Sequence, residues 1–380
     1  LFARLTSNLV FFLAVLIFAF ATTNSLAASR DQARRIHDRL LGIPPSTDME
    51  NTLSTLIQNG QFRQAVLMVL DQDLFYNSTL KDWVKPWTNE AQTYNVELND
   101  YTATVIGAIR DDVPFDQLLY TDIYYTGPDD FRRVWDDNDN NHYRDLERDG
   151  INLRASLIPK QQSAMLDVQD TAGVLTTRAY GEAYLSAGTN RRAIRFMLMT
   201  FMCRDMEQLM DTSRPNLRIR RDVDRSPGSD SRIFKKQCIG CHSGMDALGG
   251  SFAYFEYSGN RIRERTSVRG KMNQNGEVYP EGFVTSDNSW LNYWTEGSNS
   301  VLGWNGQQDG NGVRSLGRMI AASDAFPVCM AERVYKKVCV KNITAQNKTD
   351  IELLARRFKE DHGFNIKMLF VDAAEMCLVD

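Results

Sequence analysis

The sequence predicts a mainly α-helical fold that contains one small β-hairpin. Near the N-terminus, apolar residues recur at the three- and four-residue spacing of a helix, as in Ala33, Ile36 and Leu40. The same spacing returns near the C-terminus, within 350–360. Alternating Val and Tyr with glycine and Asn-Gly turn residues occur in one stretch, 262–285, which predicts the hairpin.

Residues 28–120 are expected to form an N-terminal helical module. The first helix covers 29–41 and ends at Gly42 and the Pro44–Pro45 pair, because proline cannot continue a helix. The remaining helices of the module are predicted at 49–58, 61–70, 79–88, 99–110 and, with Pro114 in the first turn, 113–119.

Residues 121–228 are expected to be irregular, with one strong amphipathic helix at 190–207. The stretch 129–150 is very acidic and is interpreted as a solvated loop. A calcium loop beginning at Asp136, with Glu147 at its twelfth position, is the weaker alternative, because Asn141 occupies the position that needs glycine.

Residues 229–312 are predicted to begin with a short helix capped by Ser229 and to include the hairpin at 262–285. They end in a surface loop, 288–312, that is rich in Trp, Asn and Gly. Residues 313–380 are expected to form a C-terminal helical bundle. Its helices are predicted at 315–322, 326–340, 350–360 and 365–377.

The first 27 residues have the three parts of a secretory signal peptide. Arg4 supplies the positive charge, Leu9 to Ala21 form the apolar run, and a small-residue cleavage site ends at Ala27. Because a membrane-spanning helix needs about 20 apolar residues, we predict cleavage and a periplasmic or extracellular location. An uncleaved anchor helix is the alternative.

Composition places the chain among ordinary globular proteins. Of its 380 residues, 43% are hydrophobic and 24% are charged. Cleavage would leave about 350 residues, and this length predicts two or three domains. The net charge of −4 argues against nucleic-acid binding.

The strongest chemical signal is the string Cys238-Ile239-Gly240-Cys241-His242. Two thiols three positions apart can each add to one vinyl group of a haem, and the following histidine can bind the iron. Gly240 is expected to leave room for the porphyrin against the backbone. One such string predicts one covalent haem c. A zinc site would need a second Cys or His pair at short spacing, and a thioredoxin-like dithiol would need a βαβ context; the sequence offers neither.

Four cysteines remain, which is enough for two disulfides in an oxidising compartment. Cys329 and Cys339 are predicted on one helix, about 15 Å apart, so they cannot pair with each other. Each is therefore expected to pair with Cys203 or Cys377. Four free buried thiols are the alternative.

The ligand opposite His242 is predicted to be Met272, which follows at a distance of thirty residues. Met319, His142, another methionine or an open site are the alternatives, and Met245 is too close in sequence to reach the other face. A methionine ligand is typical of electron transfer, whereas an open site permits ligand binding or peroxide chemistry.

Several strings resemble the planctomycete-type cytochrome c family. Residues 238–249, followed by 255–259, resemble its string Cys-x-x-Cys-His-x-x-Met/Ile-Asp-Pro-Leu-Gly and the Glu-x-Phe-Asp and Gly that follow, with Ala247 in place of the proline. Weaker similarity occurs at 33–46, 112–118, 173–177, 190–192 and 325–329. The resemblance implies a mostly helical exported cytochrome with a cytochrome c-like haem region at 229–312, and it supplies no substrate.

We therefore expect an exported mono-haem c-type cytochrome that transfers electrons outside the cytoplasm. Its expected partners are other redox proteins or envelope complex subunits, with membrane-peripheral association as an option. A haem enzyme of the peroxidase or oxidase type is one alternative. An envelope or surface assembly subunit with a structural haem, docking through the Trp-rich loop at 288–304, is another. Asp246 and Glu256 are interpreted as capping or salt-bridging groups, because no nucleophile–base pair is visible.

Overall fold

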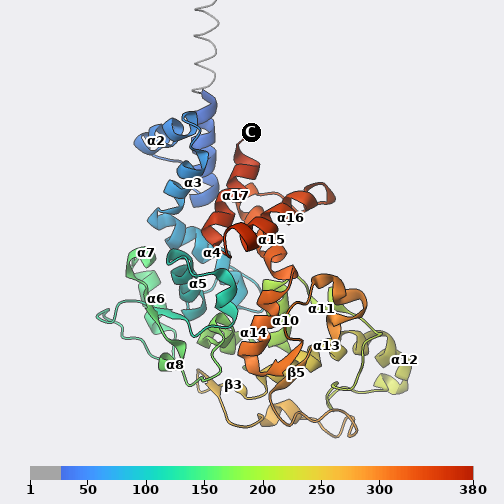
Figure 1. Cartoon of the computed structure of the whole chain (residues 1–380). Coiled ribbons are helices and arrows are strands. Elements are labelled where there is room, and N and C mark those ends of the chain that lie inside the picture. The colour runs from blue at the N-terminus through green and yellow to red at the C-terminus, as the bar shows by residue number, and fades with distance from the viewer. Residues whose placement is uncertain (1–26, 380) are drawn as a thin grey trace, which may run out of the picture.

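The computed structural model describes residues 27–379 and shows a mainly α-helical protein with three small antiparallel strand pairs (Figure 1). The predicted mainly α class is thereby confirmed, although three strand pairs stand in place of the single predicted hairpin. The predicted signal peptide, apart from Ala27, lies outside the described residues. Within the described part, no helix is long and apolar enough to cross a membrane.

The N-terminal part is helical, as predicted. It comprises a helix over residues 27–41, α2 (Thr47–Gln58), α3 (Phe62–Leu70), α4 (Lys81–Val84) and α5 (Asp100–Arg110). A π-helical segment, Phe75–Leu80, leads directly into α4, and 3-10 helices follow at Lys85–Thr88 and Phe115–Leu119. Ser46 and Asn99 cap α2 and α5, respectively, by accepting backbone N–H groups of their first turns.

The middle part contains short helices and one strand pair. The helices are α6 (Asn141–Arg148), α7 (Leu153–Ser156), α8 (Gln162–Met165), α9 (Arg178–Tyr184), α10 (Arg191–Phe201) and α11 (Met206–Leu209), and β1 (Tyr124–Thr126) pairs with β2 (Ile158–Lys160). The helix predicted at 190–207 is interrupted, because Cys203 has a φ of +52° and the chain turns before α11.

The acidic stretch is more ordered than the predicted loop. Residues 141–148 form α6, and His142 and Asp145 are buried. Glu147, the twelfth position of the calcium-like pattern, accepts hydrogen bonds from Lys85 Nζ (2.8 Å) and the backbone N–H of Leu98 (2.7 Å). Its carboxylate therefore joins α6 to the N-terminal helices.

The hairpin lies earlier in the chain than predicted. The elements of this region are α12 (Ser231–Ile233), a π-helical segment (Phe234–Cys238), α13 (Ile239–Gly249), β3 (Phe255–Ser258) and β4 (Arg261–Glu264). Gly259 and Asn260 both have positive φ values and form the tight turn between β3 and β4. Residues 265–285 form turns and a 3-10 helix instead, and Asp230 rather than Ser229 caps α12.

The Trp-rich segment is exposed in large part, as predicted, but two of its tryptophans are buried. Its ends pair as β5 (Ser289–Leu291) and β6 (Asp309–Asn311), and Trp290 and Trp294 are buried in the main core. The prediction of a surface loop was wrong for Trp290 and Trp294, because these side chains pack inward against other elements. Trp294, for example, lies against Gly244 of α13.

The C-terminal helices are α14 (Gly312–Ala322), α15 (Ala325–Cys339), α16 (Lys348–Arg356) and α17 (Ile366–Leu378). α15 packs against α16 and α17, as the predicted bundle requires, and α17 also packs against α3 (Figure 1). One apolar core therefore continues from Ala33 to Leu378, and a second, small cluster contains Ile219, Val223 and Phe234.

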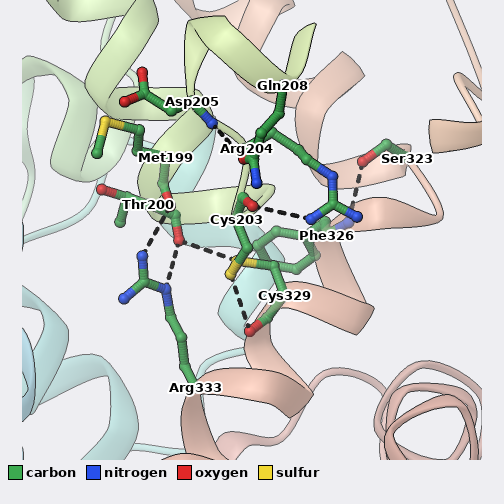
Figure 2. Close-up of a disulfide and its surroundings, with 10 residues drawn as sticks. All are labelled: Met199, Thr200, Cys203, Arg204, Asp205, Gln208, Ser323, Phe326, Cys329 and Arg333. Atoms are coloured by element: carbon green, nitrogen blue, oxygen red, sulfur yellow. Dashed lines mark hydrogen bonds between the residues drawn. A yellow bond between two sulfur atoms is a disulfide. The ribbon is translucent and has the colours of Figure 1, made fainter. Parts of the chain in front are cut away.

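Two disulfides hold α15 at its two ends, as the cysteine spacing predicted. Cys203 pairs with Cys329 beside the end of α10, and Cys339 pairs with Cys377 of α17. Figure 2 shows the first of these together with Arg333, whose guanidinium donates hydrogen bonds to the carbonyl oxygens of Met199 and Thr200. A buried cation thus caps the C-terminal end of α10 next to the disulfide.

Candidate haem-attachment site

α13 and the segment before it place the three residues of the motif on one face of a helix. Cys238 ends the π-helical segment, and Cys241 and His242 follow three and four residues later. Side chains with this spacing project from the same side. All three are partly exposed. A single flat ligand could therefore meet both thiols and the imidazole.

The two thiols are unpaired and border different apolar clusters. Cys238 and Cys241 are the free cysteines, whereas the other four form disulfides. Cys238 packs against the small cluster around Phe234, and Cys241 packs against the main core. Burial, followed by the nearby charges of Asp205 and Glu207, raises the pKa of Cys241. The Cys241 thiol is therefore protonated and stable at neutral pH.

His242 uses one ring nitrogen within the protein. Its Nδ1 lies 3.3 Å from Oδ1 of Asp246, which is one helical turn further along α13. Among residues 27–379, no hydrogen-bond partner meets the other nitrogen, Nε2. An ionised carboxylate can only accept, so Nδ1 is the donor of this contact and Nε2 is the ring nitrogen available to a ligand.

Asp246 is a buried carboxylate held by two arginines. Arg191 binds it with Nε to Oδ1 at 2.6 Å and Nη2 to Oδ2 at 2.9 Å. Arg220 donates its backbone N–H to Oδ2 at 3.1 Å, and its guanidinium lies 3.5 Å from Oδ1. Burial alone raises the pKa of Asp246, but Arg220, Arg191 and the His242 hydrogen bond outweigh it and hold the pKa well below its usual range.

The arginines extend this contact network away from His242. Arg191 also makes two hydrogen bonds of 2.7 Å to Asp222. Arg220 donates from Nη1 to the carbonyl oxygen of Thr189 at 2.7 Å and to the sulfur of Met272 at 3.5 Å. The network thus links α10, the segment before α12 and α13.

Met272 is buried, and its sulfur contacts Arg220. Arg220 contacts Asp246, which in turn meets Nδ1 of His242. The role of Met272 as the sixth ligand stays a prediction. Of the alternatives, Met319 accepts a hydrogen bond from Asn292, and His142 uses both ring nitrogens within the protein. Burial lowers the pKa of His142, which keeps that ring neutral at neutral pH.

The space beside Gly240 is filled by protein. A Cβ at this position would lie 2.3 Å from Cγ of Met210, and the carbonyl oxygen of Gly240 accepts a hydrogen bond from the N–H of Asp211. The expectation that this glycine makes room for a porphyrin is therefore wrong. It allows the 210–212 segment to pack on the side of the helix opposite His242, because two residues of helix turn by 200°.

Two cavities lie elsewhere in the described part of the chain. One, of about 560 Å³, is bordered by Glu90, Glu97 and Arg178, and the other, of about 590 Å³, lies between α3 and α17. Neither contains a residue of the motif. Within residues 27–379, no three His, Cys, Asp or Glu side chains gather as a site for a bare metal ion.

Sequence reasoning found the thiols and the imidazole but missed the arginines that hold Asp246. Arg191 opens α10 within the string Asn190-Arg191-Arg192, and Arg220 lies in a segment that was interpreted as a polar linker. One signal for Arg191 was available, because this charged residue begins a helix whose apolar stripe predicts that the helix is packed against the core. In comparisons with known proteins, no family model, curated protein or solved structure matches the chain.

Proposed function

We propose that the chain is an exported c-type cytochrome that carries one covalently attached haem and transfers electrons outside the cytoplasm. One observation carries the proposal. Of the six cysteines, the two outside the disulfides are the two that share a helix face with His242. The family resemblance agrees with it and would make the chain a distant planctomycete-type cytochrome c.

The donor set suits this cofactor. Each thiol, Cys238 and Cys241, would add across one vinyl double bond, so that a carbon–sulfur bond forms and the thiol proton goes to the neighbouring vinyl carbon. His242 would bind the iron through Nε2, the nitrogen that has no hydrogen-bond partner within the described residues. The apolar clusters beside the two thiols would cover the macrocycle. The haem would supply a one-electron change at iron.

Location and partners follow from the same proposal. Two disulfides favour an oxidising compartment, and the predicted signal peptide provides a route to it. We place the protein in the periplasm or outside the cell, next to other redox proteins or envelope complex subunits, with peripheral membrane association as an option.

A haem enzyme with an open iron position is the second candidate. It is favoured by the contact between the Met272 sulfur and Arg220, which occupies the predicted sixth ligand, and by the carboxylate partner of His242. The third alternative, an assembly subunit that docks through 288–304, is less favoured, because Trp290 and Trp294 are buried and only Trp304 of the three tryptophans is partly exposed.

The test is expression of the chain in a host that exports proteins and matures c-type cytochromes. We expect one haem to remain on the denatured polypeptide, visible as colour and as the mass of one haem. Cys238→Ser combined with Cys241→Ser removes both. The matched control, Cys339→Ser with Cys377→Ser, keeps them. A colourless wild-type protein would overturn the proposal.

Carbon monoxide separates the two candidate functions. For an electron-transfer cytochrome with a methionine ligand, we expect the absorption spectrum of the reduced protein to be unchanged by carbon monoxide. Rapid binding of carbon monoxide would instead assign the open iron position of the enzyme candidate.

A further inference from the structure

The geometry points to Asp246 as the positioning residue for His242, and to Arg191 as the group that limits how strongly this carboxylate acts on the imidazole. This inference rests on the proposed haem attachment. It does not propose a further ligand. It proposes residues that control how strongly His242 donates electrons to the iron.

The first step is the orientation of the imidazole. Asp246 lies on the same helix as His242 and meets its Nδ1, so the ring is held from the side opposite Nε2. A histidine that binds a metal commonly donates its other N–H to a carboxylate, which fixes the tautomer and makes the ligand more basic. The carboxylate here therefore directs Nε2 toward the place of the iron.

The second step is that Asp246 itself cannot move freely. Arg191 contacts both of its oxygens, and the backbone N–H of Arg220 contacts Oδ2. The side chain of Asp246 is fully buried, so solvent cannot replace these partners. An imidazole held by such a carboxylate keeps one ring orientation.

The third step concerns charge. The network contains two carboxylates, Asp246 and Asp222, and two guanidinium groups, Arg191 and Arg220, and these charges cancel. A negative carboxylate on Nδ1 increases electron donation to iron and stabilises its oxidised form. Arg191 withdraws part of that charge. Removing Asp246 or Arg191 should therefore move the reduction potential in opposite directions.

The experiment compares haem-loaded full-length proteins. We expect Asp246→Asn to raise the midpoint potential, because the amide still accepts the Nδ1 hydrogen but carries no charge. Arg191→Gln should lower it, because Arg220 is then the one guanidinium left to offset the charge of this carboxylate. The second readout is the iron-shifted proton resonance of the imidazole Nδ1–H in the oxidised protein, which Asp246→Asn should displace.

Asp222→Asn is the matched control. It removes the same charge from the same network, but Asp222 binds Arg191 and not His242. We expect a small rise in midpoint potential and an unmoved Nδ1–H resonance. A merely structural or long-range electrostatic role for Asp246 would give Asp246→Asn and Asp222→Asn the same resonance, and that result would overturn the inference.

The remaining outcomes are also decisive. If Asp246→Asn does not fold, Arg191→Gln still tests the inference, because an unchanged or higher midpoint potential contradicts the limiting role of Arg191. If the wild-type protein carries no haem, the proposed function itself fails. A haem-loaded wild-type protein whose variants behave alike refutes only the role of Asp246.

Discussion

Val340 is the residue at which local backbone strain is clearest. It follows α15 with φ +51° and ψ +42°, in the left-handed region, and its side chain is 63% exposed. A left-handed conformation costs an L-residue roughly 1–2 kcal/mol, and glycine is the usual choice directly after a helix. The strain is local, because the exposed valine packs against little.

We predict that Val340→Gly increases the free energy of unfolding by about 0.5 kcal/mol, because the relief of strain exceeds the entropy that glycine adds to the unfolded chain. Urea titration of both proteins checks this. Val301→Gly is the control. That valine is 84% exposed within a 3-10 helix, and its replacement should destabilise by about 0.5 kcal/mol. Equal effects of the two substitutions would contradict the argument.

At the residue scale, the sequence predicts those site residues that lie close together in the chain. The sequence singles out Cys238, Cys241 and His242 as a group, and helical spacing alone brings them to one face, while their role in haem binding stays a prediction. Arg191 and Arg220 lie 55 and 26 residues before Asp246, and only the packing of α10 and the segment before α12 brings them to it. The spacing of residues along the sequence does not indicate such a contact.

At the scale of elements, Glu147 joins α6 to α4. Its carboxylate lies 2.8 Å from the Nζ atoms of Lys81 and Lys85. Burial alone raises the pKa of Glu147, but the two lysines and the N–H of Leu98 outweigh it and lower the pKa to about 2, from 4.5 in an exposed glutamate. The folded state therefore binds this proton more weakly than the unfolded state does.

A depressed folded pKa gives stability that is fully present above pH 4.5 and is lost as the pH falls toward 2. We predict that Glu147→Gln lowers the free energy of unfolding by about 2 kcal/mol at neutral pH, and that this difference shrinks across that window. Urea titrations at several pH values measure it. Glu352→Gln, in an exposed pair with Lys348, should cost below about 0.5 kcal/mol. A pH-independent difference at Glu147 would contradict the prediction.

The elements themselves were predicted unevenly. Long amphipathic helices such as α2, α5 and α15 were predicted within a few residues, because the 3.6-residue period extends over several turns. The hairpin was misplaced, because Asn275-Gly276 offered the usual turn signal while the true turn, Gly259-Asn260, has the reverse order. Two short strands carry too few residues for alternation to decide between these turns.

At the scale of the whole molecule, the disulfides connect parts that are far apart in sequence. Cys203 and Cys329 close a loop across 126 residues, and Cys339 and Cys377 close one across 38. Loop-closure entropy assigns them about 5 and about 4 kcal/mol, respectively. Two cross-links on α15 therefore restrict the unfolded chain strongly.

We predict that Cys203→Ala with Cys329→Ala costs more stability than Cys339→Ala with Cys377→Ala, by about 1 kcal/mol. Urea unfolding of the two double variants under oxidising conditions measures the difference. A mild reductant added to the wild-type protein should lower its stability and leave the proposed haem attached, because thioether bonds are not reduced as disulfides are. Loss of the haem with reductant would contradict covalent attachment.

The overall packing was the least predictable level. The helical class followed from periodicity, and the reach of a helix excluded a bond between Cys329 and Cys339 but left the choice of partner for each open. The contact of α17 with α3, which brings the two ends of the described chain into one core, did not follow from either. An apolar stripe indicates that one face of a helix is covered, but it does not identify the element that covers it. Trp290 and Trp294 are a further example, because elements distant in the sequence, and not the neighbouring residues, bury them.

The close approach at Gly244 affects how a mutational scan of this protein must be interpreted. An added Cβ would lie 2.1 Å from a ring carbon of Trp294, on the opposite side of α13 from the imidazole. Even alanine would push the helix away from its support. If the chain carries the proposed haem, a Gly244→Ala variant that loses its colour would resemble a variant that lacks an iron ligand, although the damage is mechanical. Replacing Trp294 with a smaller ring in the same variant should then restore the colour.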